Sequence, residues 1–232
     1  GLVSVLLQIR KILVKLKKLY KSKNIIIMVG GSGMYADAVM FGLDKFPKVP
    51  DKVRSQINLF YQTHGLNSLQ QLLLEKDPKY YSRVDINNPM RLIRALEVCI
   101  SSEKPYSSFL GKKLINRSFI SKTIILNCSR TMLYDRINNR VDSMVESGLE
   151  FEAKKLMKHK DLPSLKTVGY KELFPYFEGK ISLEKAISEI KKNTRRYAKR
   201  QITWLKRYDN AISVESSIKS EKIIRLLKSN SL

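Results

Sequence analysis

The stretch from Asn24 to Tyr35, NIIIMVGGSGMY, decides the fold class of this chain. Its first half, residues 24–29, is a short apolar run rich in β-branched residues, which is typical of a buried parallel strand. The glycines that follow predict a tight turn into a helix over residues 35–41. This order favours an α/β protein, and the free amides at the start of the helix favour an anion. The pattern alone is weak, because it matches neither G-x-G-x-x-G nor the G-x-x-x-x-G-K-[ST] phosphate loop.

Residues 2–20 predict a basic amphipathic helix, with side chains such as Arg10 and Lys15 between apolar ones. A targeting peptide or a helix on a membrane surface has the same pattern. We favour a helix packed in the fold, because a strand pattern follows it at once. No apolar run approaches the ~20 residues that a membrane span needs, so no membrane partner is expected.

After a proline-containing linker at residues 46–51, the sequence predicts only helices before the next strand. They cover residues 51–62, 66–76, 78–83 and 88–101. This run of helices indicates an insertion into an α/β fold. We therefore expect an α/β core of residues 1–50 and 121–232, which includes a basic helix, and a helical insertion of residues 51–120.

A second strand, KTIILNC, is predicted over residues 122–128, and Ser129 is placed to cap the helix that follows. On that helix Arg136 and Arg140 share one face, with Asp142 close by. A surface ion-pair ladder is one interpretation. The other is a two-pronged anion clamp at the carboxyl end of a buried strand, which its position favours. Later patterns predict helices over residues 148–159 and 170–178, a short strand over 211–214 and a helix to about residue 229.

A further helix is predicted over residues 182–207, and its second half, NTRRYAKRQITWLKR, contains no acidic residue. At about 100° per residue, the basic side chains fall on an arc of about 140°. They are Lys185, Lys192, Arg195, Arg196, Lys199, Arg200, Lys206 and Arg207. Such a stripe is typical of a phosphate-backbone footprint. An ordinary solvated face is the alternative, which the missing acidic partners disfavour.

The composition also indicates a polyanionic partner. The 232 residues include 44 Lys and Arg against 21 Asp and Glu, a formal net charge of +23. Nucleic acid is the first expectation and an anionic membrane surface the second. Cys99 and Cys128 are far apart, and His64 and His159 lie near no ligand pattern, so neither a disulfide framework nor a metal site is expected. A reduced cytoplasmic location is the default expectation.

Several ordered stretches together resemble one family, the bacterial tRNA dimethylallyltransferases, also called tRNA isopentenyltransferases or IPP transferases. They are VGGSGMY (29–35), DINNPMRLIRALEV (85–98), RINNRVDSMVESGL (136–149), TVGYKE (167–172) and NTRRYAKRQITW (193–204). The resemblance covers nearly the whole chain. It implies a P-loop-kinase-like parallel sheet with flanking helices, plus a helical insertion that grips the tRNA anticodon stem-loop.

The implied reaction moves a dimethylallyl group from dimethylallyl diphosphate to N6 of the adenosine just 3′ of the anticodon, and releases diphosphate. The adenine must leave its stack, as in base-flipping enzymes. A monomer that binds tRNA and dimethylallyl diphosphate is therefore expected. Ser32 stands where the family usually has Thr, beside the flipped nucleotide, and Arg140 matches the arginine that neutralises the diphosphate.

The resemblance implies tRNA contacts at Ser32 and Arg54 and in three further stretches. They are Met90, Arg91, Leu92, Ile93 and Arg94; Lys166, Thr167, Val168, Gly169, Tyr170 and Lys171; and Arg200, Gln201, Ile202, Thr203, Trp204, Leu205, Lys206 and Arg207. Among these, Trp204 is interpreted as a packing anchor rather than a stacking platform.

One departure from the family is large. The phosphate loop GPTASGKT, with its ATP-type nucleotide site, and the aspartate of DS-x-Q-x-Y, the family's general base, are not in this sequence. Ligands for Mg²⁺ are expected in that segment, not in this chain. The chain is then either part of an ordinary enzyme or a truncated product that binds RNA without catalysis. A third hypothesis, prenylation of free adenine nucleotides, is disfavoured by the long basic footprint. We expect residues 1–232 alone to bind RNA, to show no transfer and to be poorly soluble at an open sheet edge beside residues 24–29.

Overall fold

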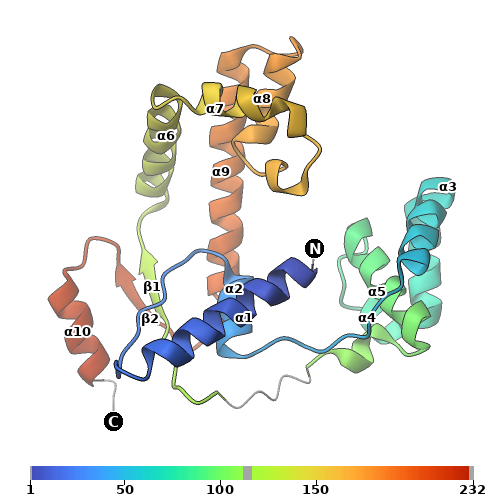
Figure 1. Ribbon diagram of the computed structural model, residues 1–232, viewed down its shortest axis with the longest axis horizontal. Coiled ribbons are helices and arrows are strands. Elements are labelled where there is room, and N and C mark those ends of the chain that lie inside the picture. The colour runs from blue at the N-terminus through green and yellow to red at the C-terminus, as the bar shows by residue number, and fades with distance from the viewer. Residues whose placement is uncertain (1, 112–116, 230–232) are drawn as a thin grey trace. The chain divides into compact units, whose positions relative to one another are not determined.

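Two hydrophobic cores organise the part of the chain that the structure describes. The computed structural model describes residues 2–111 and 117–229 (Figure 1). Contacts divide the chain into a helical unit, residues 1–28 and 34–119, and a sheet unit, residues 29–33 and 120–232.

The domain boundaries expected from the sequence differ from these units in one region. The sequence places residues 1–50 with the α/β core, whereas most of them are grouped with the helical unit. Both divisions separate the chain close to residue 120. The predicted assignment of residues 1–50 therefore stays a prediction.

Helices fill the first half of the chain. The elements are α1 (Leu2–Leu19), α2 (Gly33–Met40), α3 (Asp51–Lys76), α4 (Pro78–Tyr81), α5 (Pro89–Ser102) and the 3₁₀ turn η1 (Tyr106–Phe109). Helices α3 and α5 pack against each other through fully buried leucines, among them Leu69, Leu73, Leu92 and Leu96. The predicted helical insertion is thus a small bundle with its own core (Figure 1).

Helix α3 contains a break at Gly65, whose backbone has φ +75° and ψ −171°. Only glycine adopts this conformation without strain, because it has no Cβ. The sequence predicts separate helices over residues 51–62 and 66–76, and the break lies between them. The prediction of two helical segments is therefore confirmed.

In the described residues, the second half of the chain combines a short sheet with five α-helices and two 3₁₀ turns. The elements are β1 (Ile124–Asn127), α6 (Arg130–Glu146), α7 (Leu149–Leu156), η2 (Met157–His159), η3 (Pro163–Leu165), α8 (Tyr170–Phe177), α9 (Leu183–Leu205), β2 (Ile212–Glu215) and α10 (Ser220–Ser229). Strands β1 and β2 pair in parallel, with Ile124 opposite Ile212 and Asn127 opposite Glu215. Both strands were predicted from the sequence and both are confirmed.

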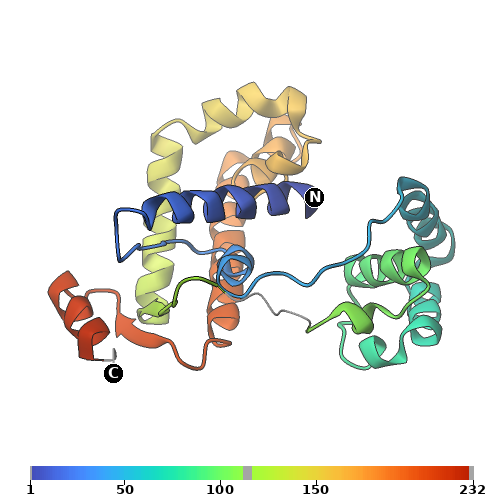
Figure 2. The ribbon, with the colours of Figure 1, turned by 60° about the horizontal axis from the view of Figure 1, so that its bottom comes forward.

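Helices α6 and α9 lie side by side, and α7 and α8 join them at one end (Figure 1, Figure 2). Ser129 caps α6 by accepting a hydrogen bond from the Met132 amide over 3.2 Å, as its place in the sequence indicates. The core of this unit includes Val141 from α6, Leu173 from α8 and Ile190 from α9. The first half of α9 is thereby fixed in the core.

The prediction of a buried strand over residues 24–29 is wrong. This segment belongs to no strand, and Ile25, Ile27 and Val29 are 82%, 83% and 91% exposed. A strand needs a neighbour that pairs with its amides and carbonyls, and no described segment supplies one. The run therefore stays irregular, with apolar side chains in solvent.

Candidate functional site

The glycine turn that follows residue 29 lies against the second half of α9. Gln201 donates a hydrogen bond from Nε2 to the carbonyl oxygen of Gly31 over 2.7 Å. A Cβ atom added to Gly31 would lie 2.3 Å from the same nitrogen, and one added to Gly33 would lie 2.1 Å from the Trp204 ring. Glycine is thus required at position 33, where a Cβ would enter the rigid indole, whereas the flexible end of Gln201 could move away from a Cβ at position 31. Two motifs that are far apart in the sequence meet here.

The only tryptophan in the chain, Trp204, forms the centre of this junction. Its ring packs on Gly33, and the guanidinium carbon of Arg207 lies 4.6 Å from the centroid of the ring. Such a geometry is a cation–π contact. The interpretation of Trp204 as a packing anchor agrees with this geometry.

Ser32 lies between Gly31 and Gly33, and its side chain is exposed. The backbone on both sides is fixed by contacts to α9, so the hydroxyl has a defined place at the junction. A hydroxyl there can donate or accept one hydrogen bond from a ligand.

The charges of α9 differ between its two halves. In the first half, Lys191 pairs with Asp142 over 2.6 Å, and Lys185 and Lys192 both pair with Glu189. These are ordinary surface ion pairs, so the predicted one-sided stripe is wrong for this half. The hydrogen bond from Lys192 also lowers the pKa of Glu189 below its usual value.

The second half of α9 keeps the expected excess of positive charge. Lys199, Arg200 and Lys206 are exposed, and none pairs with an acidic side chain in the described parts of the chain. Arg200 instead lies over the ring of Tyr197, with its guanidinium carbon 5.5 Å from the centroid. The unpaired charge is therefore concentrated at the end of α9 that carries the glycine junction.

A buried carboxylate, Glu172, joins the loop of residues 166–171 to α9. Glu172 is 6% exposed and accepts hydrogen bonds from the Gly169 amide and from Asn193 Nδ2, each over 2.9 Å. Gly169 has φ +111°, a conformation that favours glycine. Arg196 in turn donates to Asn193 Oδ1 over 3.3 Å. The network connects the loop to the basic half of the helix.

Sequence reasoning did not single out Glu172 or Asn193, which join the loop to α9. The signal was present for Glu172, because it lies three residues after Gly169, the spacing of a capping box. Within the loop, Lys166, Thr167 and Lys171 are exposed, whereas Val168 and Tyr170 are half-buried and Gly169 is buried. A hydrogen bond to Glu152 raises the pKa of Tyr170.

On α6, Arg136 and Arg140 have different environments. Arg136 donates from Nη1 to Ser216 Oγ over 3.0 Å, close to the carboxyl end of β2. Arg140 is exposed and has no hydrogen bond or ion pair within the described residues. Asp142 pairs with Lys191, not with either arginine. The ion-pair ladder therefore does not form, and Arg140 remains available to an anion.

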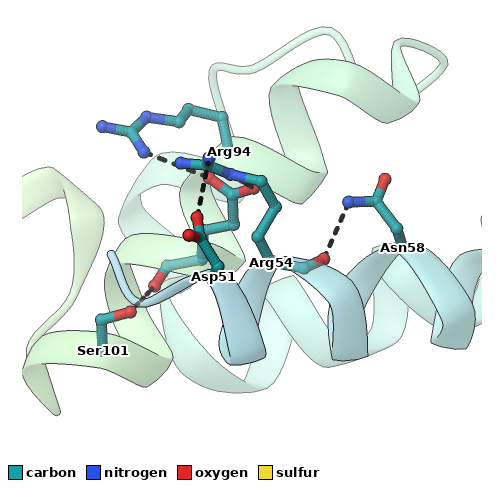
Figure 3. Close-up of polar contacts among 6 residues, drawn as sticks. Asp51, Arg54, Asn58, Arg94 and Ser101 are labelled. Atoms are coloured by element: carbon teal, nitrogen blue, oxygen red, sulfur yellow. Dashed lines mark hydrogen bonds and ion pairs between the residues drawn. The ribbon is translucent and has the colours of Figure 1, made fainter. Parts of the chain in front are cut away.

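In the helical unit, the predicted stretch of residues 90–94 divides by burial. Met90 and Arg91 are exposed, whereas Leu92 and Ile93 are 0% and 3% exposed within the core. The side chains of these two residues therefore face the core, not a ligand. The remaining residue, Arg94, meets Arg54 on the carboxylate of Glu97 (Figure 3).

The described ranges, residues 2–111 and 117–229, contain neither a metal-binding cluster nor a membrane-spanning helix. No three His, Cys, Asp or Glu side chains there come together in a way that would hold a metal ion. No helix there combines the length and the apolar character that crossing a membrane requires. The described residues thus offer no Mg²⁺ cage.

The family model described as IPP transferase matches residues 5–208. This chain belongs to the IPP transferase family. A protein of Christiangramia forsetii named tRNA dimethylallyltransferase is 52% identical over 195 residues, which cover 84% of this chain and 65% of the relative. A protein of the same name from Flavobacterium psychrophilum is 47% identical, covering 94% of this chain and 73% of the relative. The chain thus spans about two thirds of the length of its IPP transferase relatives.

A solved IPP transferase structure supports the fold. The tRNA delta(2)-isopentenylpyrophosphate transferase of Staphylococcus epidermidis is 27% identical, with a TM-score of 0.60 over 96% of this chain and 75% of that protein. The α/β class expected from the sequence is confirmed, with a two-stranded parallel sheet in the described residues.

Proposed function

We propose that this IPP transferase modifies tRNA. It transfers a dimethylallyl group from dimethylallyl diphosphate to N6 of the adenosine just 3′ of the anticodon. The bond between C1 of the dimethylallyl group and the diphosphate oxygen breaks, and a bond from N6 to C1 forms. N6 loses a proton and diphosphate leaves. The names of the relatives support this reaction.

The observation that carries the proposal is the junction between the glycine turn and α9. It places the exposed hydroxyl of Ser32 beside the end of α9 where Lys199, Arg200 and Lys206 have no acidic partner among the described residues. Cations at this density suit a phosphate backbone, and the hydroxyl suits a base that has left its stack. A free nucleotide would not need a basic surface of this length.

Arg140 is the proposed partner of the diphosphate. It is exposed, without a competing acidic side chain in the described structure, and lies one turn from Arg136. Adenine N6 is a weak nucleophile, so stabilisation of the leaving diphosphate lowers the barrier more than binding of the ground state does. Mg²⁺ would bind together with the diphosphate. The described residues include no group of side chains that would hold it.

The tRNA-binding part of the proposal is tested by salt dependence. Replacing Lys199, Arg200 and Lys206 by Ala should weaken tRNA binding, and each lost phosphate contact should lower the slope of log K against log salt by about 0.7 to 0.9. Lys185, Lys191 and Lys192 provide a matched triple variant, because they lie on the same helix in ion pairs. An equal effect of both triple variants would contradict the footprint.

The catalytic part is tested by transfer of labelled dimethylallyl groups to tRNA in the protein that carries this chain. Arg140→Ala should cost about 2–4 kcal/mol of transition-state stabilisation, while the Kd for tRNA stays nearly unchanged. Arg225→Ala, which removes an exposed arginine of α10, serves as the control. If the Kd for tRNA instead rises by the same factor by which the transfer rate falls, Arg140 binds the tRNA and not the diphosphate. Binding without any transfer would leave only an RNA-binding function.

A further inference from the structure

Glu97 is a buried carboxylate on which arginines from two helices meet. Arg54 of α3 donates from Nε to Glu97 Oε1 over 3.3 Å, and Arg94 of α5 donates from Nη1 to Oε2 over 3.1 Å. Each oxygen of the carboxylate thus holds a different arginine. The Glu97 side chain is 7% exposed, whereas those of Arg54 and Arg94 are 51% and 30% exposed. The negative charge lies inside the bundle and the guanidinium groups extend to its surface.

The packing of the bundle fixes this arrangement. Glu97 and Arg94 belong to the helix that supplies Leu92, Leu96 and other core residues, so their backbone cannot shift easily. The guanidinium carbon of Arg94 also lies 5.7 Å from the centroid of the Phe46 ring, a cation–π contact.

The position of Arg54 is less restrained than that of Arg94. Its second ion pair, to Asp51 over 3.5 Å, adds little because the Asp51 side chain is 97% exposed. Asn58 Nδ2 donates to the backbone carbonyl of Arg54 over 2.7 Å, but this bond holds the helix and not the guanidinium (Figure 3). Glu97 is therefore the main contact that orients the Arg54 side chain.

Both arginines retain donors for a ligand. A guanidinium has five N–H donors, and the contact with Glu97 uses one from each arginine. One carboxylate shared by two cations leaves the pair positively charged. Two guanidinium forks that converge at a surface suit the oxygens of one phosphate group.

We propose that Glu97 is a positioning residue that holds Arg54 and Arg94 together as a clamp for one backbone phosphate of the bound tRNA. This inference rests on the proposed function, because it requires that tRNA is the ligand. It adds a residue that does not touch the RNA and acts through the two arginines that do.

The substitution Glu97→Gln separates positioning from simple charge. It raises the net charge by one, so general attraction to a polyanion predicts tighter tRNA binding. The clamp predicts weaker tRNA binding. The amide of glutamine keeps one oxygen that can accept from one arginine, but its NH₂ group, a donor, faces the other arginine and cannot hold it. We expect the Kd for tRNA to rise about tenfold and the salt slope to fall by about 0.9. Fluorescence anisotropy with labelled tRNA at several salt concentrations measures both.

Two controls separate positioning from damage to the fold. Glu75→Gln makes the same charge change at an exposed site of α3 and should not weaken binding. Glu97→Gln should also have no further effect on the Kd in a chain that already carries Arg54→Ala and Arg94→Ala. A purely structural role of Glu97 would weaken binding in both backgrounds.

Arg54→Lys keeps the test valid if Glu97→Gln does not fold. Arg54 is half exposed, so this variant preserves the core and the charge, but a lysine lacks the planar fork that bridges Glu97 and a phosphate. We expect a severalfold rise in the Kd. If Glu97→Gln binds tRNA as tightly as the wild type or more tightly, the clamp is overturned but the proposed function is not. If Glu97→Gln does not fold, the same result for Arg54→Lys has the same meaning. A wild-type chain that binds no tRNA would overturn the proposed function as well.

Discussion

The ring of Trp204 occupies the space that any side chain at position 33 would need. A Cβ at Gly33 would lie 2.1 Å from two ring atoms, far inside van der Waals contact. The atoms concerned belong to a rigid indole and not to the flexible end of a side chain. The residue at position 33 and the ring at position 204 are therefore mutually dependent, although they are far apart in the sequence.

Gly33→Ala should displace the ring of Trp204 and loosen the junction. Because the chain has one tryptophan, its fluorescence reports on this contact alone. We expect emission at longer wavelength, stronger quenching by iodide and weaker tRNA binding. Gly30→Ala is the matched control, since nothing lies within 4 Å of a Cβ at that position. Identical spectra for both variants would show that Trp204 does not pack on Gly33 in solution.

The residues that join the glycine turn to α9 could be predicted from the sequence only in part. The glycine turn and the basic segment were both identified, because each has a local signature. Their contact through Gln201 and Gly31 could not be found, since it joins residues far apart along the chain. Glu97 and Glu172 were missed for the same reason. The role of a buried carboxylate depends on its hydrogen-bond partners in space, such as Arg54 and Asn193, and adjacent residues in the sequence do not reveal them.

Helix α3 shows at the scale of an element how one residue sets the geometry. At Gly65 the backbone adopts a conformation that is strained for any residue with a Cβ. The two halves of the helix bury Ile57, Leu69 and Leu73 in one core. The break allows both halves to contribute to the core that also orients Arg94. Glycine is therefore a structural requirement in the middle of this helix, where it is normally unfavourable.

Gly65→Ala should lower the free energy of unfolding by about 1–3 kcal/mol, because alanine must adopt the strained conformation or straighten the helix. Urea unfolding followed by circular dichroism measures this change. Asn67→Ala, at an exposed position of the same helix, should change stability by no more than about 0.5 kcal/mol. If Gly65→Ala were instead stabilising, helix propensity would outweigh the strain.

An ion-pair cluster at the end of α8 should make stability depend on pH. Hydrogen bonds from Lys160 and Lys180 lower the pKa of Glu178 from its ordinary value to about 2. A depressed carboxyl pKa stabilises the folded state above the ordinary pKa of about 4.5, and this effect is lost as the pH falls towards 2. The stability difference between wild type and Glu178→Gln should thus be present at pH 6 and absent near pH 2. A constant difference across this range would exclude the ionised pair as its cause.

Most elements could be predicted from local pattern, whereas the segment of residues 24–29 could not. Helix starts such as Ser129, and strands such as residues 124–127, follow from signals within a few residues. An apolar, β-branched run also has a strong local signal, but it forms a strand only where another strand pairs with it. The partner is a property of the fold, so the sequence pattern of this segment predicts a strand that the described chain does not form.

At the scale of the whole molecule, the same segment presents several apolar side chains to solvent, with the half-buried Ile26 among them. Ile25, Ile27, Met28 and Val29 are between 46% and 91% exposed. Clustered exposed apolar side chains favour association, and backbone groups outside a sheet can pair with another chain. This property follows from the fold and not from the overall composition, whose net charge of +23 opposes association.

Replacing Ile25 and Ile27 by Lys should reduce self-association without lowering the thermal midpoint, because neither side chain packs in a core. Sedimentation velocity over a range of protein concentrations measures association, and circular dichroism measures the midpoint. Leu59→Lys provides the comparison, since Leu59 is 62% exposed on a helix whose backbone groups are paired. Equal association of all three chains would exclude the segment as its source.

Helix α9 sets a fixed length between two parts of the candidate RNA surface. Asn193 holds the loop of residues 166–171 through Glu172, and Gln201 and Trp204 hold the glycine turn. At 1.5 Å per residue, the helix keeps Asn193 and Trp204 about 16 Å apart. One inserted residue would turn the far end by about 100° and move its side chains away from the turn, whereas seven would restore the face about 10 Å further on. A change in the number of residues between Asn193 and Trp204 would therefore disrupt this spacing even if every side chain named here were kept.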